Sequence, residues 1–338
     1  MLPMAGMIAI LGCTASGKSA LAEAIAGEIH RRGGAAPTVM AVDSMQVYRG
    51  MDIGTSKPSR EIQAHIPHAM IDLVEPSESY SAARFREAAL KIIEEHRLNN
   101  RPIILAVGTI LYFKAVTEGL FSGPPAVAHV REELSRIADL QGSAVLHQRL
   151  TEVDPVSASR IHPNDRRRLI RALEVYQMTG EPISTLQQQW LANRPQIDFP
   201  LILVDWPREE LSQRINRRVM QMIRGGLVDE VRELMARPGG LSMQAAQAVG
   251  YKEIIEHLQG RCSLDDAAEQ IKINTRHLAK LQRTWLRRYT PTLTIRPTPE
   301  APVESFAAEI IRRLGEDFGS QESESSPGAV RSVTDQKA

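Results

Sequence analysis

The stretch IAILGCTASGKSALAEAIA, residues 8–26, decides the fold of this chain. The apolar residues 8–11 predict a short buried strand, and a helix is expected over 18–31. The loop between them, residues 12–19, matches the pattern G-x-x-x-x-G-K-[ST]. A strand before this loop and a helix after it are the context that the pattern needs, because the backbone N–H groups of the loop then face phosphate oxygens at the start of a helix. The sequence therefore predicts a phosphate-binding loop.

The pattern indicates a polyphosphate but does not identify ATP. Lys18 would add positive charge, and the Ser19 hydroxyl would bind Mg²⁺. The strand predicted at 103–107 ends in Gly108-Thr109, where an NTPase normally has an acid. Asp43 and Asp205 each close another predicted strand, so either could help to hold Mg²⁺, and nucleotide hydrolysis is not implied.

Further short apolar runs lie at 38–43, 102–108 and 200–205, and an amphipathic helix is expected over 81–97. Strands that alternate with helices predict an α/β fold whose core is a parallel sheet with a phosphate-binding loop. Residues 121–199 have helical patterns and no strand candidate, so they are expected to form a helical insertion domain.

The rest of the chain follows from this division. Residues 1–120 and 200–315 would form the α/β core together with a helical C-terminal part, which includes a long helix at 264–289. The Ser-rich, aromatic-poor residues 316–338 are expected to be a disordered tail.

Composition limits the environment of the protein. The 338 residues exceed the length of one ordinary domain, and the net charge of +1 decides nothing about a polyanionic partner. Cys13 and Cys262 lack metal-ligand spacing, which fits a reducing compartment. The N-terminal segment predicts neither a signal peptide nor a membrane span, so we expect a cytoplasmic protein without a membrane partner.

A second stretch, AVDSMQVYRGMDIGTSKP at 41–58, follows the second predicted strand. Asp43 would lie at the carboxyl end of that strand, where ligands bind to open α/β sheets. Its carboxylate could hold a metal or act as a general base. Ser44, Met45 and Gln46 are suited to contact with a planar group. A helix-capping Asp followed by ordinary loop residues is an equally good interpretation of these residues alone.

Basic residues are concentrated in two places. No Asp or Glu occurs from 270 to 298, where helical spacing would align Lys272, Arg276, Lys280, Arg283 and Arg287 in one stripe. A second cluster surrounds Asp165 and contains Arg160, Arg166, Arg167, Arg168 and Arg171. Such stripes are typical of contact with a nucleic-acid backbone. The alternative is a solvated helix face with internal ion pairs.

Two further classes of protein fit the loop and the sheet. A small-molecule kinase would bind ATP and would not depend on RNA. An RNA-binding regulatory NTPase would need the arginines but not Asp43. Neither class requires the block around Asp43.

Several blocks together identify a family. They are GCTASGKS (12–19), DSMQVYRGMDIGTSKP (43–58), YSAARF (80–85), GTILY (108–112), IHPNDRRRLIRALEV (161–175), GLVDEVREL (226–234), AVGYKEI (248–254) and LAKLQRTWLRR (278–288). In this order they resemble the tRNA dimethylallyltransferases, also called tRNA isopentenyltransferases. The resemblance covers nearly the whole chain before the tail. Cys13, Ala69, Ile110 and Leu281 replace a proline, a histidine, a glycine and an arginine that are usual in the family.

The resemblance implies an activity. The enzymes of this family transfer a dimethylallyl group from dimethylallyl diphosphate to the exocyclic amine of adenosine at tRNA position 37, in the anticodon stem-loop, and release pyrophosphate. Asp43 would be the general base, and Thr109 would lie near the reacting centre. Arg218, in preference to Arg214, would stabilise the pyrophosphate. Mg²⁺ would bind to Ser19, and a monomer is expected.

The resemblance also implies which residues bind each substrate. The diphosphate would contact Gly12, Thr14, Ala15, Ser16, Gly17, Lys18 and Ser19. The tRNA would contact Asp43, Ser44, Met45, Gln46, Arg167, Arg168, Leu169, Ile170, Arg171, Lys280, Gln282, Arg283 and Arg287.

Overall fold

The computed structural model describes residues 6–119, 123–124, 127–192 and 199–319. The chain divides into two compact units, one formed by residues 1–116 with 197–338 and the other by residues 117–196. The helix α15 (Ala307–Gly319) includes residues 316–319, which were predicted to belong to the tail. The remainder of that predicted tail lies outside the described residues.

The first unit is built on a six-stranded parallel sheet with the order β3-β2-β4-β1-β5-β6. Its strands are β1 (Met7–Gly12), β2 (Thr38–Val42), β3 (His68–Ala69), β4 (Ile103–Val107), β5 (Leu201–Val204) and β6 (Leu293–Ile295). Every residue of β1, β2 and β4 is buried, as expected for strands that are covered on both faces. The predicted α/β fold with a parallel sheet is confirmed.

Two strands were missed by the sequence analysis. The strand β3 has only two residues, and β6 has three residues in a proline-rich segment, so neither produces a recognisable apolar run. The strand β6 extends the sheet beyond β5, with Ile202 aligned to Leu293. The C-terminal part is therefore not purely helical, which corrects the prediction.

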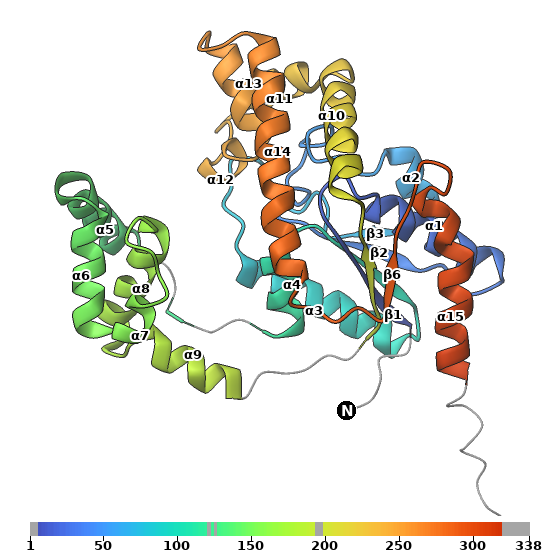
Figure 1. Cartoon of the computed structure of the whole chain (residues 1–338), viewed down its shortest axis with the longest axis horizontal. Coiled ribbons are helices and arrows are strands. Elements are labelled where there is room, and N and C mark those ends of the chain that lie inside the picture. The colour runs from blue at the N-terminus through green and yellow to red at the C-terminus, as the bar shows by residue number, and fades with distance from the viewer. Residues whose placement is uncertain (1–5, 120–122, 125–126, 193–198, 320–338) are drawn as a thin grey trace, which may run out of the picture. The chain divides into compact units, whose positions relative to one another are not determined.

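The helices of the first unit surround this sheet (Figure 1). They are α1 (Lys18–Arg31), α2 (Arg60–His65), α3 (Ala82–Leu98), α4 (Ile110–Thr117), α10 (Arg208–Arg224), α11 (Leu227–Ala236), α12 (Met243–Ala246), α13 (Tyr251–Leu258), α14 (Leu264–Leu286) and α15, with a 3-10 turn at Val303–Phe306. The helix α1 packs on β1, β2 and β4, and α15 packs against α1. The long helix α14 lies beside α10 and also contacts β1.

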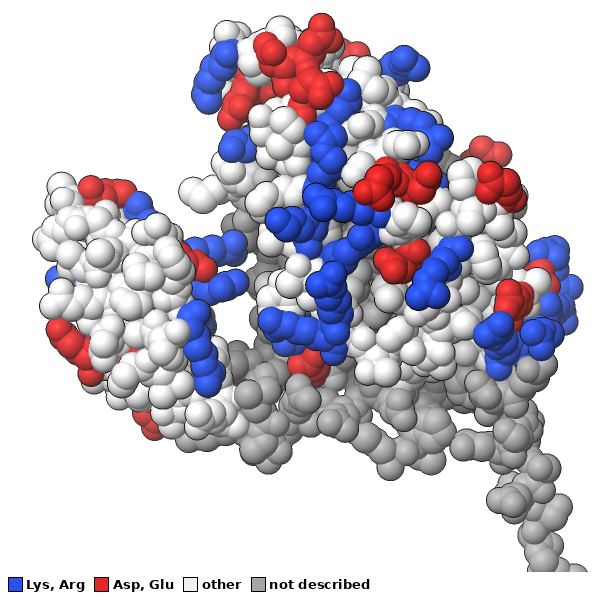
Figure 2. Space-filling view, viewed as in Figure 1, with Lys and Arg blue, Asp and Glu red and all other residues white. Residues whose placement is uncertain are grey.

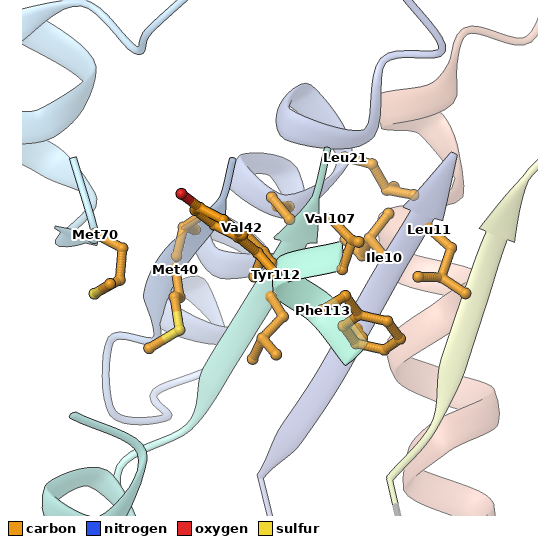
Figure 3. Close-up of a cluster of buried hydrophobic side chains, with 14 of the residues drawn as sticks. Ile10, Leu11, Leu21, Met40, Val42, Met70, Val107, Tyr112 and Phe113 are labelled. Atoms are coloured by element: carbon orange, nitrogen blue, oxygen red, sulfur yellow. The ribbon is translucent and has the colours of Figure 1, made fainter. Parts of the chain in front are cut away.

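The buried core fixes the strand ends from which the candidate site is built. Figure 3 shows Tyr112 and Phe113 of α4 lying over the strands that carry Ile10, Val42 and Val107. These side chains are at most 5% exposed. Because β4 lies between β1 and β2, the three loops that follow these strands begin next to one another.

The second unit consists of helices with a core of its own. They are α5 (Ala128–Gln141), α6 (Ser143–Val153), α7 (Pro155–Ala158), α8 (Arg166–Thr179) and α9 (Ile183–Ala192). Leu134, Leu146, Leu150 and Leu169 are almost fully buried in this core. The fully buried carboxylate of Glu174 accepts hydrogen bonds from Arg131 at 2.8 and 3.0 Å, and its Oε1 also accepts one from the Val127 amide.

Candidate active site

The loop of residues 12–19, which we call the glycine loop, joins β1 to α1. Gly17 is the N-cap of α1, with φ 92°, and no side chain caps the helix. A Cβ at Gly17 would lie 2.6 Å from a methyl group of Val303, so glycine is required here for space as well as for its dihedral angle. The first N–H groups of α1 have no partner within the helix. The loop therefore presents free donors at the positive end of a helix dipole.

Side chains from distant parts of the chain hold the carbonyl groups of the glycine loop. The Arg214 Nε donates to the Ala15 carbonyl at 2.9 Å, and the Trp206 indole donates to the Ser16 carbonyl at 2.8 Å. The Arg214 guanidinium also lies 4.3 Å from the centre of the Trp206 ring. These contacts occupy the carbonyls of Ala15 and Ser16, and the N–H groups of Gly17 and Lys18 have no partner among the described residues.

An acid and a hydroxyl follow the neighbouring strands β2 and β4. The Asp43 Oδ1 accepts a hydrogen bond from the Met45 amide at 2.8 Å. The Thr109 Oγ1 accepts one from the Ser44 amide at 2.9 Å and donates to the Ser44 hydroxyl at 3.1 Å. Both functional side chains are therefore fixed by the backbone of the residues that follow Asp43.

Gly108 determines how closely the two strand ends approach. A Cβ at Gly108 would lie 2.3 Å from the Asp43 Oδ2, a distance at which atoms overlap. The amides of Gly108 and Thr109 both donate to the Val42 carbonyl, at 3.0 and 2.9 Å. Only glycine lets the backbone lie this close to the carboxylate.

The glycine loop, Asp43 and Thr109 line one pocket of about 490 Å³. Two cations also line it, Lys18 and Arg218, and neither has a hydrogen bond or ion pair within the described parts of the chain. Burial lowers the pKa of Lys18 to about 8, an effect that the Asp43 carboxylate opposes and Arg218 reinforces. Burial also lowers the pKa of Arg218, again against the influence of Asp43. Two desolvated cations beside a single carboxylate leave excess positive charge in the pocket, which favours binding of an anion.

The pocket also has an apolar part and a suitable acid. Ile215, Val219 and Met222 of α10 line it together with the polar groups. Of the two acids that could assist a metal, Asp43 lines the pocket, whereas Asp205 does not and lies 3.5 Å from Arg283. Cations that could bind an anion, an apolar wall and a carboxylate that could accept a proton thus line one cavity.

Known proteins are similar to this chain over most of its length. The family model described as IPP transferase matches residues 46–289. The chain belongs to this family. It is 44% identical to the tRNA dimethylallyltransferase of Geobacter sulfurreducens over 83% of this chain and 89% of that protein. It is 41% identical to the enzyme of the same name from Nitrosococcus oceani over 87% and 93% of the two chains.

Solved structures agree as well. The full-length tRNA isopentenylpyrophosphate transferase of Bacillus halodurans is 35% identical, with a TM-score of 0.64, over 94% of this chain and 99% of that one. A eukaryotic dimethylallyltransferase solved acting on tRNA is 26% identical, with a TM-score of 0.75, over 93% and 79%.

Most residues predicted for the core of the site line the pocket. They are Thr14, Ala15, Gly17, Lys18, Ser19, Asp43, Ser44, Met45, Gln46, Thr109, Arg218 and Gln282. Gly12 and Ser16 are buried and are not among the lining residues. The Arg214 Nε is bonded to the glycine loop, whereas Arg218 lines the pocket beside Lys18, which favours Arg218 as the ligand-binding arginine of this pair.

The residues of α8 that were predicted to contact tRNA differ in their exposure to solvent. The side chains of Leu169 and Ile170 are buried in the core of the helical unit, so any contact with RNA would be through their backbone, and that contact stays a prediction. Arg171 bonds the Glu174 carboxylate at 2.7 Å. Arg167 is exposed, and Arg168 is exposed and lies 3.3 Å from Asp165.

The basic residues predicted to form one stripe on α14 also differ in their exposure to solvent. Lys280 and Arg287 are exposed, and Figure 2 shows Lys and Arg side chains gathered over α14 and α10. Arg283 is half-buried and donates to the Trp206 carbonyl at 2.6 Å. Gln282 is only 9% exposed, and both ends of its amide are bonded within the protein; its contact with RNA stays a prediction.

The residues that hold the glycine loop were not predicted from the sequence. Trp206, Arg214 and Val303 contact the loop from positions about two hundred residues or more along the chain, and no local pattern reveals such pairs. The one available signal was the position of Trp206 directly after Asp205 at the end of a predicted strand.

Proposed function

We propose that this protein transfers a dimethylallyl group from dimethylallyl diphosphate to the exocyclic amine of adenosine at position 37 of tRNA, releasing pyrophosphate. The observation that supports this best is the placement of Asp43 and Thr109 in the same pocket as the glycine loop, Lys18 and Arg218. A phosphate site alone would suit many enzymes. A phosphate site that shares its cavity with a fixed carboxylate and an apolar wall suits the transfer of a hydrocarbon group to a nucleophile.

The acceptor half of the reaction rests on Asp43. The lone pair of an adenine amine is delocalised into the ring, so the amine attacks carbon poorly until it begins to lose a proton. The carbon–nitrogen bond forms at the allylic carbon as the carbon–oxygen bond to the diphosphate breaks, and Asp43 accepts the proton. Thr109 lies beside this centre. Ser44, Met45 and Gln46 would contact the base.

The donor half rests on the glycine loop. The departing pyrophosphate gains negative charge in the transition state, and donors aimed at that charge lower the barrier. The N–H groups from Ala15 to Ser19, with Lys18 and Arg218, would supply those donors. The described residues contain no group of three or more His, Cys, Asp or Glu side chains suited to a metal. The pattern of the glycine loop indicates that Mg²⁺ would be held by the Ser19 hydroxyl, and it would supply charge neutralisation.

The RNA half rests on exposed cations. Arg167 and Arg168 of the helical unit and Lys280 and Arg287 of α14 would contact the backbone of the anticodon stem-loop. The target adenosine must leave its stack to enter the pocket, at a cost of about a few kcal/mol that pocket contacts offset. No helix of the described residues has the length and apolar character to span a membrane. We expect the enzyme to act as a monomer.

The test is incubation of purified protein and Mg²⁺ with an unmodified tRNA transcript and labelled dimethylallyl diphosphate, with ATP omitted. The expected result is label on the tRNA, and no label on a matched transcript with guanosine at position 37. Failure to label the tRNA, or a strict requirement for ATP, would refute the proposal.

A further inference from the structure

The side chain of Gln282 on α14 bridges the two loops that form the pocket. Its Oε1 accepts a hydrogen bond from the Thr14 amide of the glycine loop at 2.8 Å. Its Nε2 donates to the Gly108 carbonyl, also at 2.8 Å. Thr14 is 268 residues from Gln282 in the sequence, and Gly108 is 174 residues from it. The bridge therefore depends on tertiary packing and not on local sequence.

The chemistry of an amide suits both contacts at once. One loop presents an N–H group and the other presents a carbonyl, so the bridging side chain must accept on one side and donate on the other. Asn has the same groups but is one methylene shorter, and an ionised Glu cannot donate. Since Gln282 is 9% exposed, a lost hydrogen bond would leave a nearly buried polar group without a partner.

The Gly108 contact reaches the reacting groups. The Gly108 backbone lies directly against the Asp43 carboxylate, because a Cβ there would be 2.3 Å from the Asp43 Oδ2. The next residue is Thr109, whose hydroxyl bonds the residue after Asp43. A shift of the Gly108 carbonyl would therefore move the Gly108 backbone, which lies against the Asp43 carboxylate.

The Thr14 contact is part of a wider attachment of α14 to the glycine loop. The Cys13 thiol donates to the Ala279 carbonyl at 3.4 Å, one turn before Gln282. Arg283, next to Gln282, donates to the Trp206 carbonyl, and the Trp206 indole holds the Ser16 carbonyl. The helix thus fixes the glycine loop on one side while Gln282 fixes the Asp43 side.

We propose that Gln282 is a positioning residue that sets the distance between the diphosphate and the attacking amine. Its amide is bonded to Thr14 and Gly108, and it acts through these two residues. This inference rests on the proposed function, because the separation of the two loops matters only if a donor held by one reacts with an acceptor held by the other. A misplacement of about 1 Å can lower the rate of a positioned reaction about 100-fold.

The test compares Gln282→Met with Gln270→Met in the full-length protein. Gln270 is exposed on the same helix and bonds only Asn274, so its variant controls for the loss of an amide from α14. For Gln282→Met we expect kcat to fall about 10- to 100-fold, while the Kd values for pyrophosphate and for tRNA stay within about threefold of wild type, since the binding groups on each loop remain. Gln270→Met should match wild type in all three quantities.

A double-mutant cycle with Gly108→Ala separates positioning from general loosening. If both substitutions act by displacing Asp43, the double variant should lose much less activity than the product of the two single losses. A kcat for Gln282→Met within twofold of wild type, additive losses in the cycle, or a loss of pyrophosphate binding as large as the loss of kcat would overturn the inference. An inactive wild-type protein would instead refute the proposed function.

Discussion

The substitution Gly108→Ala tests the placement of the general base directly. The new Cβ would lie 2.3 Å from the Asp43 Oδ2, whereas ordinary contacts begin near 3.4 Å, so one of the two must move by about 1 Å. The backbone of Gly108 does not have the positive φ that favours glycine, so alanine is compatible with the main chain and the perturbation is steric. The carboxylate would be pushed away from the position that its bond to the Met45 amide defines.

The expected loss follows from this displacement. A shift of about 1 Å corresponds to a fall in kcat of about 100-fold, or about 2.7 kcal/mol in activation free energy. Overpacking should also cost about 1–3 kcal/mol of folding stability. Single-turnover transfer of the labelled dimethylallyl group to tRNA measures the first effect, and urea unfolding measures the second.

Gly27→Ala is the matched control, because a Cβ at Gly27 in α1 meets nothing within 4 Å. That variant should keep wild-type activity and be equally or more stable. The pyrophosphate Kd of Gly108→Ala should stay near wild type, since its glycine loop is intact. If the Gly108→Ala variant transfers the group within threefold of the wild-type rate, the position of the Asp43 carboxylate does not control the rate. That result would refute the assignment of Asp43 as the base.

Other substitutions address separate parts of the account. Asp43→Asn should lower single-turnover transfer by about 10²–10⁴-fold and leave the tRNA Kd within a few-fold, as measured by filter binding; an equal loss of both would make Asp43 structural. Arg218→Ala should weaken pyrophosphate binding by calorimetry at unchanged Tm, whereas Arg214→Ala should lower Tm as well because it releases the Ala15 carbonyl. Because burial lowers the pKa of Lys18 to about 8 and a bound anion favours its charged form, pyrophosphate affinity should fall above pH 8, by up to about tenfold per pH unit; the same slope in Lys18→Arg would exclude this cause. Glu174→Gln should destabilise the protein by about 3 kcal/mol in urea unfolding, and an unchanged midpoint would show that its ion pairs contribute nothing.

The sequence predicted the parts of the fold that depend on local pattern. Apolar runs located β1, β2, β4 and β5, and the glycine loop located the start of α1, because burial on both faces and phosphate binding each impose a short continuous signature. The strands β3 and β6 are too short to produce such a signature, and their place in the sheet is set by pairing with distant strands.

Site residues could be predicted where function imposes a continuous sequence motif. They could not be predicted where the role of a side chain depends on which distant residues pack against it. Helical spacing placed Arg283 and Arg287 on one face of α14, but spacing cannot show what covers that face. The structure places the Trp206 carbonyl against Arg283 and leaves Arg287 exposed. Gln282 was assigned to RNA by the family resemblance, and its bridge was not predicted because the two loops that bond its amide come from residues far away in the chain.

The measurement that bears most directly on the central claim is the stoichiometry of the reaction. Pyrophosphate released and adenosines modified should be counted in the same reaction of protein, tRNA, Mg²⁺ and dimethylallyl diphosphate, with labelled ATP added as a bystander. If the glycine loop holds a leaving group, one pyrophosphate appears for each modified adenosine and the ATP is not consumed. Cleavage of ATP in proportion to product, or modification without release of pyrophosphate, would contradict the account.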